Sequence, residues 1–517
     1  MGGMLLFFIV GCQKQKDKIA FPTTDLTKTA LIPKPRTMTA TYTAFGLGKN
    51  TAIYANNPKI AEIGRFLSEK IEGRTTLSLP VNGPVEKPSG NAPENLIYIV
   101  ISDTIRSDSP ESYELNIKED SILLKVKTPE ATFRGIQTLL QMVPEKSNDT
   151  LVDSPLWLIP SGKIMDAPEF EYRGTMLDVA RHFFSVEEVK RYIDLIAYYK
   201  LNVLHLHLSD DQGWRIEIKS WPKLTTIGGK YEVGGGTGGF YTQKEYQEIV
   251  KYASEHFITV VPEIDMPGHT HAACLSYPFL DGTGKSLKPY TGTRVGFSTL
   301  DTKKDTVYTF VKDVVREISA ITPGPYFHIG GDESFVTKKK AYRYFVKRVE
   351  GIVEKYNKRM IGWDEISEAA ISSNAIAQHW RTEENAIRAY KNGNKIILSP
   401  AKKAYLDMKY DSLTKYGLDW AGHIPVDTAY IWNPATYIKS FPKESILGIE
   451  APLWSETIGN SDEIEYLAFP RIIGYAELGW SEPEKLDWKD YKKRLAGQTS
   501  FLEKNSVNFY KSPLIDW

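Results

Sequence analysis

Two adjacent carboxylates follow a short apolar segment in the second half of the chain. Asp332 and Glu333 come directly after residues 326–331, where a run typical of a buried strand ends in two glycines that let the backbone turn. At such a strand end, one carboxylic acid can donate a proton and its neighbour can stabilise a developing positive charge. An acid and a nucleophile that flank a glycosidic bond stand about 5 Å apart across it. Adjacent residues diverge instead, so we expect both to serve one side of a substrate.

Tryptophans form a second group with possible chemistry. Trp363, Trp380 and Trp454 each end a predicted strand, and flat rings at one rim can stack on sugar faces and shield a reactive intermediate from water. Tyr405 and Asp407 are two apart, which places a hydroxyl and a carboxylate on the same side. Later loops add two further candidates, Trp432 and Glu456.

Histidines support a rival hypothesis. His205 and His207 alternate along one predicted strand, His269 and His271 follow the next, and His328 lies on a third. Alternate strand residues share a face, so these rings could bind a metal ion in an amidohydrolase-like barrel. A metal hydrolase does not require the three tryptophans, which favours the sugar-binding interpretation. The sequence also allows a non-catalytic sugar-binding lipoprotein.

Short strand patterns alternate with amphipathic helical patterns from about residue 172, which predicts parallel βα units. Eight such units predict a (β/α)8 TIM barrel over residues 169–500, whose catalytic groups lie at the C-terminal ends of the strands. Residues 21–168 predict a smaller α+β domain, and residues 501–517 a tail packed on the barrel. The strands are expected at 174–179, 203–208, 259–264, 326–330, 359–363, 375–380, 395–399 and 447–452.

Composition and the N-terminus restrict partners and location. Lys plus Arg and Asp plus Glu are both 64, so net charge gives no reason to expect binding to nucleic acid or an anionic membrane surface. Residues 4–10 are apolar and lead to Cys12, which resembles a bacterial lipobox. Residues 1–20 are therefore predicted to be a signal peptide and tether. We expect an exported protein in the periplasm, outer membrane or cell surface, lipid-anchored at Cys12. Only Cys274 remains, so no internal disulfide or cysteine metal site is expected.

Four ordered motifs make the prediction specific. They are RGTMLDVARHFF at 173–184, HLHLSDDQGWR at 205–215, PEIDMPGH at 262–269 and HIGGDE at 328–333. Together they resemble the β-N-acetylhexosaminidases of glycoside hydrolase family 20, over nearly all of residues 21–500. The resemblance implies an exo-acting, retaining enzyme in which the 2-acetamido group of the substrate is the nucleophile. It implies a glycan substrate with a terminal N-acetylhexosamine, and neither cofactor nor metal.

The resemblance also implies a role for each candidate residue. Glu333 is the expected general acid/base, Asp332 orients the acetamido group, and Tyr405 hydrogen-bonds to its carbonyl. Asp210 and His269 are expected to position the two acids. The cage around the sugar and its acetyl group would comprise Trp363, Trp380 and Trp454, the ring hydroxyls would bind Arg181, Asp407 and Glu456, and Trp432 would be a platform for the leaving-group sugar.

Overall fold

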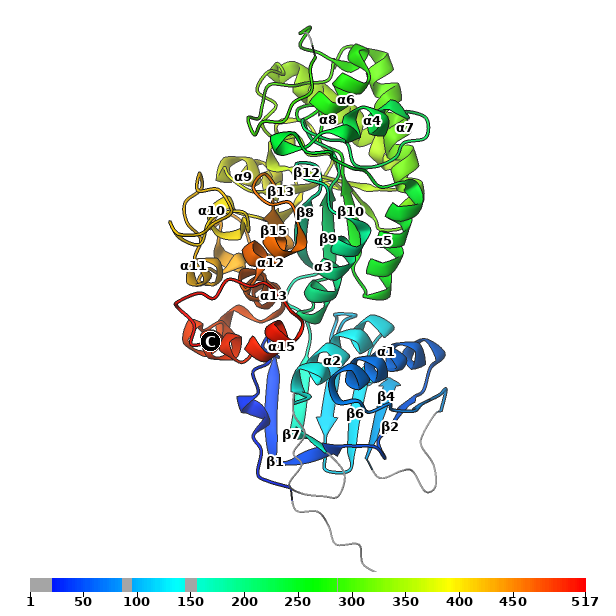
Figure 1. Cartoon of the computed structure of the whole chain (residues 1–517), viewed down its shortest axis with the longest axis vertical. Coiled ribbons are helices and arrows are strands. Elements are labelled where there is room, and N and C mark those ends of the chain that lie inside the picture. The colour runs from blue at the N-terminus through cyan, green and yellow to red at the C-terminus, as the bar shows by residue number, and fades with distance from the viewer. Residues whose placement is uncertain (1–20, 86–94, 145–155, 286) are drawn as a thin grey trace, which may run out of the picture.

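The computed structural model describes residues 21–85, 95–144, 156–285 and 287–517. A sheet domain lies at one end of the molecule and a larger barrel fills the rest (Figure 1). Cys12 and the predicted signal peptide lie outside the described residues. Among the residues that are described, no helix is both long and apolar enough to cross a membrane.

The N-terminal domain is a mixed seven-stranded sheet in the order β1-β7-β5-β6-β4-β2-β3. Two helices, α1 (Pro58–Thr75) and α2 (Pro129–Met142), cover the sheet on the side toward the barrel (Figure 1). Both begin with proline after a side-chain cap, Asn57 for α1 and Thr128 for α2. The strands are β1 (Thr37–Leu47), β2 (Ala52–Ala55), β3 (Val81–Asn82), β4 (Leu96–Ile101), β5 (Tyr113–Ile117), β6 (Ser121–Val126) and β7 (Trp157–Asp166).

Eight parallel strands close into a barrel, which confirms the predicted fold class. Each observed strand boundary is within two residues of its predicted position. The largest helices around the barrel are α3 (Val186–Tyr198), α5 (Gln243–Glu255), α7 (Asp305–Ile321), α8 (Lys339–Lys355) and α13 (Arg471–Trp480). The strands are β8 (Tyr172–Asp178), β9 (Val203–His207), β10 (Thr259–Glu263), β11 (Tyr326–His328), β12 (Arg359–Trp363), β13 (Ile376–His379), β14 (Lys395–Leu398) and β15 (Ile446–Leu453).

A buried ion cluster joins the two domains. Glu111, in the N-terminal domain, lies 2.7 Å from Arg134 of α2 and 2.6 Å from Arg173 of β8. Arg134 also donates a hydrogen bond to the backbone oxygen of Phe257 in the barrel. Burial would raise the pKa of Glu111, but the two guanidinium groups lower it to about 2. The carboxylate is therefore charged, and it holds the first barrel strand against α2.

The C-terminal segment packs on the barrel and also contacts the N-terminal domain, where Arg74 lies over the ring of Phe501. Phe501, in α15 (Thr499–Lys504), stacks on Tyr198 of α3 with ring centroids 3.8 Å apart. Tyr510 stacks on Tyr410 at 4.0 Å, and its hydroxyl donates a hydrogen bond to Asp411. These aromatic contacts place the last residues of the chain on the barrel side.

Candidate active site

The turn after β11 places the two adjacent acids. Gly330 has a φ of 65° and Gly331 a φ of 100°. Residues that carry a Cβ rarely adopt such positive φ angles. The Gly331 amide donates to Oδ1 of Asp265 at 3.0 Å, and a Cβ on Gly330 would lie only 1.9 Å from that oxygen. Glu333 itself has a φ of 43°. Such strain in a non-glycine residue is typical of functional sites.

A histidine stands beside both acids. Nε2 of His269 is 3.8 Å from Oδ2 of Asp332 and 3.8 Å from Oε2 of Glu333. On its other side, Nδ1 of His269 is 3.1 Å from Oδ1 of Asp210. Burial raises the pKa of Glu333, and the neighbouring charge of Asp332 raises it further, while His269 opposes both. A carboxyl group with a raised pKa keeps its proton at higher pH, as a general acid requires.

Arg181, which follows β8, forms one corner of the site. Its guanidinium lies 2.8 Å from Oδ2 of Asp210, 3.1 Å from Asp178 and 3.8 Å from Glu456. It also lies over the ring of Trp454, 4.8 Å from the centroid. This cation is therefore held between buried carboxylates and an aromatic face, at the edge of the pocket.

Aromatic side chains form the opposite wall. Trp380 and Tyr405 are stacked with centroids 6.3 Å apart, and Trp454 is 6.2 Å from Tyr405. The indole nitrogen of Trp380 donates to both oxygens of Glu365, at 3.1 Å each. Trp420 stands edge-on to Trp380 and Tyr405 and is 52% exposed. The wall thus has buried rings at its base and an exposed ring at its rim.

These side chains enclose a pocket of about 220 Å³. It is smaller than the ~300–1,000 Å³ typical of drug-sized ligand sites, and it suits a single sugar ring. Its lining residues are Arg181, His269, Thr293, Val295, Asp332, Glu333, Trp380, Arg381, Tyr405, Asp407, Leu418, Trp420, Trp454 and Glu456.

Several buried polar atoms of the pocket have no hydrogen-bond partner within the described residues. They include both carboxylate oxygens of Asp407, Oε2 of Glu456 and Oδ1 of Asp332. Burial raises the pKa of Asp407 well above its usual range, and the charge of Glu456 adds to the effect. Unpaired buried polar groups cost about 1–3 kcal/mol each, so a ligand that pairs them would be bound strongly and specifically.

Most of the residues proposed from sequence line this pocket, and three of them do not. Asp210 lies behind the lining, where it supports Arg181 and His269. Trp363 is buried beneath Trp454, with ring centroids 5.8 Å apart. Trp432 does not line the pocket at all.

The structure corrects the choice of Trp432 as a platform. Its indole nitrogen donates to the backbone oxygen of Ala429 at 2.9 Å, and its ring packs on Tyr437. The tryptophan at the pocket rim is Trp420, which sequence reasoning missed. Both residues lie in the long connection between β14 and β15, and neither follows a strand directly, so strand-end position could not distinguish them.

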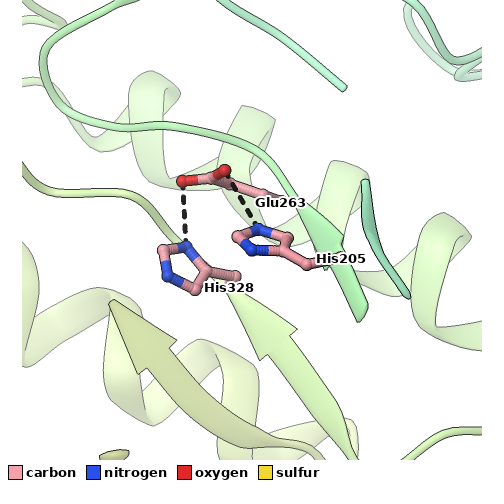
Figure 2. A group of neighbouring side chains, drawn as sticks. All are labelled: His205, Glu263 and His328. Atoms are coloured by element: carbon pink, nitrogen blue, oxygen red, sulfur yellow. Dashed lines mark ion pairs between the residues drawn. The ribbon is translucent and has the colours of Figure 1, made fainter. Parts of the chain in front are cut away.

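Three of the five histidines of the rival hypothesis, His205, His207 and His328, are buried on barrel strands, whereas His269 lines the pocket and His271 begins α6 (His271–Ser276). Figure 2 shows Glu263 between His205 and His328, 3.0 Å from Nε2 of the first and 2.9 Å from Nδ1 of the second. These three side chains are close enough to share an ion. However, the oxygens of Glu263 already face four side-chain nitrogens, those of His205, His207, His328 and Trp363. Each oxygen of Glu263 thus already has two nitrogen neighbours, so the proximity of these side chains is not by itself evidence of a metal site.

Family models match both domains of the chain. Residues 170–483 match the model described as "Glycosyl hydrolase family 20, catalytic domain", and residues 28–167 match "Glycosyl hydrolase family 20, domain 2". The chain belongs to glycoside hydrolase family 20. Membership confirms the predicted family, the barrel and the β-N-acetylhexosaminidase class, and it does not favour the metal-dependent or non-catalytic alternatives.

Relatives within glycoside hydrolase family 20 cover nearly the whole chain. A β-N-acetylhexosaminidase of Cellulomonas fimi is 36% identical, over 94% of this chain and 97% of that protein. A β-hexosaminidase of Porphyromonas gingivalis is also 36% identical, over 98% of this chain and 67% of its own length. The solved β-N-acetylhexosaminidase of Streptomyces coelicolor has 42% identity and a TM-score of 0.89, covering 96% of this chain and 99% of that one. A Streptomyces plicatus enzyme solved with Thio-NAglucal matches equally well, over 97% and 100%.

Proposed function

We propose that this enzyme removes terminal β-linked N-acetylhexosamine from glycans by substrate-assisted catalysis with retention of configuration. The observation that carries the proposal is the placement of Asp332 and Glu333. They are adjacent, they share His269, and they open on one pocket whose size suits one sugar ring. Two adjacent carboxylates on one turn can supply an acid and a charge-stabilising group on the same side of the substrate, whereas a carboxylate that acts as nucleophile stands across the bond from the acid.

The proposed first step breaks the glycosidic bond. Glu333 donates its proton to the glycosidic oxygen, and the carbonyl oxygen of the 2-acetamido group attacks the anomeric carbon. The leaving alcohol departs with the bond electrons, and an oxazolinium-type ring forms on the substrate. Asp332 stabilises the positive charge at the amide nitrogen, and the Tyr405 hydroxyl holds the acetamido oxygen. Burial raises the pKa of Tyr405 well above its usual range, so this hydroxyl keeps its proton.

The second step is hydrolysis of the ring. A water molecule attacks the anomeric carbon from the side that the leaving group vacated, and Glu333 accepts the proton of that water. Two inversions at one carbon give net retention, and the acetamido group is restored. Trp380, Trp454 and Tyr405 exclude other water from the reactive ring.

Recognition of a chain end follows from the buried carboxylates. Asp407 and Glu456 present unpaired oxygens in the pocket that Arg181 also lines, which suits the hydroxyl groups of a terminal sugar. Trp420, exposed at the rim, is the platform we propose for the leaving-group side, in place of Trp432. A mutant β-hexosaminidase of Streptomyces plicatus has been solved in complex with its product GlcNAc, which supports this substrate class.

The decisive assay compares aryl β-GlcNAc and aryl β-GalNAc with an aryl β-glucoside that lacks the acetamido group. We expect hydrolysis of one or both N-acetyl substrates, inhibition by a thiazoline mimic of the ring intermediate, and no effect of a chelator. Equal turnover of the plain glucoside, or loss of activity with the chelator, would contradict the mechanism.

We also propose that the enzyme is exported and lipid-anchored at Cys12, in the periplasm or at the outer membrane or cell surface. The lipobox-like pattern Ile9-Val10-Gly11-Cys12 supports this location. Expression of the full chain with Cys12→Ser should release the enzyme from the membrane fraction. Unchanged fractionation of this variant would contradict the anchor.

A further inference from the structure

Glu263 lies between His205 and His328 in a buried cluster inside the barrel (Figure 2). It ends β10, and its side chain is fully buried. Oε1 accepts a hydrogen bond from the indole nitrogen of Trp363 at 3.1 Å and lies 2.9 Å from Nδ1 of His328. Oε2 contacts Nδ1 of His207 and lies 3.0 Å from Nε2 of His205. One carboxylate therefore meets four side chains that come from three neighbouring strands.

One branch from this carboxylate leads to the catalytic acids. His207 contacts Glu263 through Nδ1, and its Nε2 lies 2.9 Å from Oδ2 of Asp210. Oδ1 of Asp210 is 3.1 Å from His269, which stands 3.8 Å from Glu333. Each ring is fixed by a carboxylate on its far side, so the orientation of His269 depends on contacts that begin at Glu263.

A second branch leads to the aromatic wall. Trp363 is fully buried, and its indole nitrogen donates to Glu263, which fixes the rotation of the ring. Trp363 packs on Trp454, and Trp454 packs on Tyr405 of the pocket. The ring of His207 also meets Trp454, with centroids 5.0 Å apart. The two branches therefore converge on the same wall.

We propose that Glu263 is a positioning residue that holds both the Asp210–His269 pair and the Trp363–Trp454 wall in their catalytic arrangement. The inference rests on the proposed function. It adds that one buried carboxylate, which touches no substrate, orients two parts of the site at once. One is the Asp210–His269 pair beside the catalytic acids, and the other is the aromatic wall that would hold the acetamido group.

Charge strengthens the coupling between Glu263 and His207. Burial alone would raise the pKa of Glu263, but His207, His328 and His205 hold it well below its usual range. Burial alone would lower the pKa of His207, but Glu263 and Asp210, with a smaller effect of Asp178, raise it well above the usual value. The ring of Trp454 stands nearly perpendicular to the same imidazole. Loss of the Glu263 charge should therefore lower the pKa of His207 toward neutral pH.

The test is Glu263→Gln in the full chain, because glutamine keeps the shape and removes the charge. We expect kcat on aryl β-GlcNAc to fall about 10–100-fold, as when groups supporting a reactive centre are lost. We also expect weaker inhibition by a thiazoline, and a new ionisation near neutral pH in the kcat/KM profile. A merely structural role would lower stability but leave these three properties of the folded enzyme unchanged.

Glu450→Gln is the matched control. Glu450 is equally buried in the barrel and contacts His205, Tyr172 and Gln378, but neither His207 nor Trp363. We expect this variant to keep the wild-type thiazoline affinity and pH profile. The inference is overturned if folded Glu263→Gln behaves as wild type, or if Glu450→Gln produces the same changes.

Two further variants separate the branches and remain informative if Glu263→Gln does not fold. Trp363→Phe removes the indole N–H contact with Glu263 and reduces the ring area that packs on Trp454, and it should weaken thiazoline binding without a new ionisation. His207→Gln should lower kcat with a smaller effect on thiazoline binding. If both variants have the kcat and thiazoline affinity of the wild type, the inference is overturned. Failure of the wild-type enzyme on every N-acetyl substrate would instead contradict the proposed function.

Discussion

At the scale of single residues, the site separates two neighbouring acids by their environment. Glu333 is partly exposed to the pocket, with a raised pKa, and Asp332 lies deeper, with Oδ1 unpaired within the described structure. An acid that must release a proton and an acid that must stabilise a charge need such different surroundings. Substitutions of the two acids should therefore change different kinetic properties of the enzyme.

Glu333→Gln should lower kcat/KM for substrates with poor leaving groups by about 10²–10⁴-fold, because general acid catalysis contributes about that much. Natural disaccharides should be affected more than aryl glycosides, whose leaving groups need less protonation. The measurement is steady-state kinetics on both substrate types. Near-normal turnover of the disaccharide would remove Glu333 from the proposed role.

Asp332→Asn should act on both rate and pH dependence. Loss of the amide contact should lower kcat for 2-acetamido substrates while leaving binding largely intact. The charge of Asp332 raises the pKa of Glu333, so its removal should lower that pKa. The protonated acid is required in the first step, and the alkaline limb of the pH profile should therefore move to lower pH. An unchanged limb would show that the two carboxyl groups are not coupled.

Trp420→Ala should raise KM for a disaccharide more than for an aryl glycoside, because the exposed ring lies at the rim where the leaving sugar would stack. Stacking on an aromatic ring contributes about 0.5–1.5 kcal/mol, which corresponds to roughly a 2–10-fold change. Trp432→Ala is the matched control from the same connection. A larger effect of Trp432→Ala on KM would instead favour Trp432 as the platform for the leaving-group sugar.

At the scale of elements, the short strand β11 and the turn after it decide where the acids lie. The strand ends at His328, two residues before its predicted end, because the backbone turns at Gly330 and Gly331. The Asp265 carboxylate and the Tyr342 hydroxyl, which donates to the Gly331 oxygen at 2.6 Å, hold this turn. Catalytic geometry thus depends on a backbone conformation available to glycine.

Gly330→Ala should disturb this turn and reduce kcat, because the added Cβ would lie 1.9 Å from Oδ1 of Asp265. Strain of this kind costs about 1–3 kcal/mol. Gly284→Ala is the matched control, since Gly284 also has a positive φ, 70°, but has open space around it. Thermal unfolding and kcat should be measured for both. Equal effects would show that backbone strain alone, and not the contact with Asp265, explains the result.

At the scale of the whole molecule, the N-terminal domain is joined to the barrel by the Glu111 cluster. Arg134 and Arg173 are fully buried and share this one carboxylate. Breaking a buried ion pair by removing one partner costs about 3–5 kcal/mol, because the remaining charge stays unpaired. The connection between domains is therefore sensitive to a single residue that is far from the pocket in sequence.

Glu111→Gln should lower the unfolding temperature clearly, and the wild type should lose stability in acid. The folded pKa of about 2 lies below the unfolded value of about 4.3. The stabilisation by the charged Glu111 is therefore fully present above the pKa of the unfolded state, and it is lost as pH falls through the pKa of the folded state. Thermal unfolding from pH 6 to 2 would measure it. Glu130→Gln, which removes a more exposed partner of Arg134, should have a smaller effect, and an equal effect would contradict the cluster's role.

The sequence by itself determined the barrel, the family and most of the pocket. Strand patterns are local, and in a closed parallel barrel all C-terminal strand ends meet at one rim, so strand patterns alone bring residues such as Asp332, Trp380 and Tyr405 together. Glu263 was visible in a motif, but its contacts with Trp363 join strands one hundred residues apart.

Only the tertiary structure showed that Trp420 lines the pocket while Trp432 does not, and that Trp363 is buried beneath the pocket. In a long connection between strands, the direction of a side chain follows from packing against distant segments, and no short-range period encodes it. Strand periodicity therefore predicts which residues lie near the rim, whereas packing decides which of these residues, on strands and in loops, face the pocket.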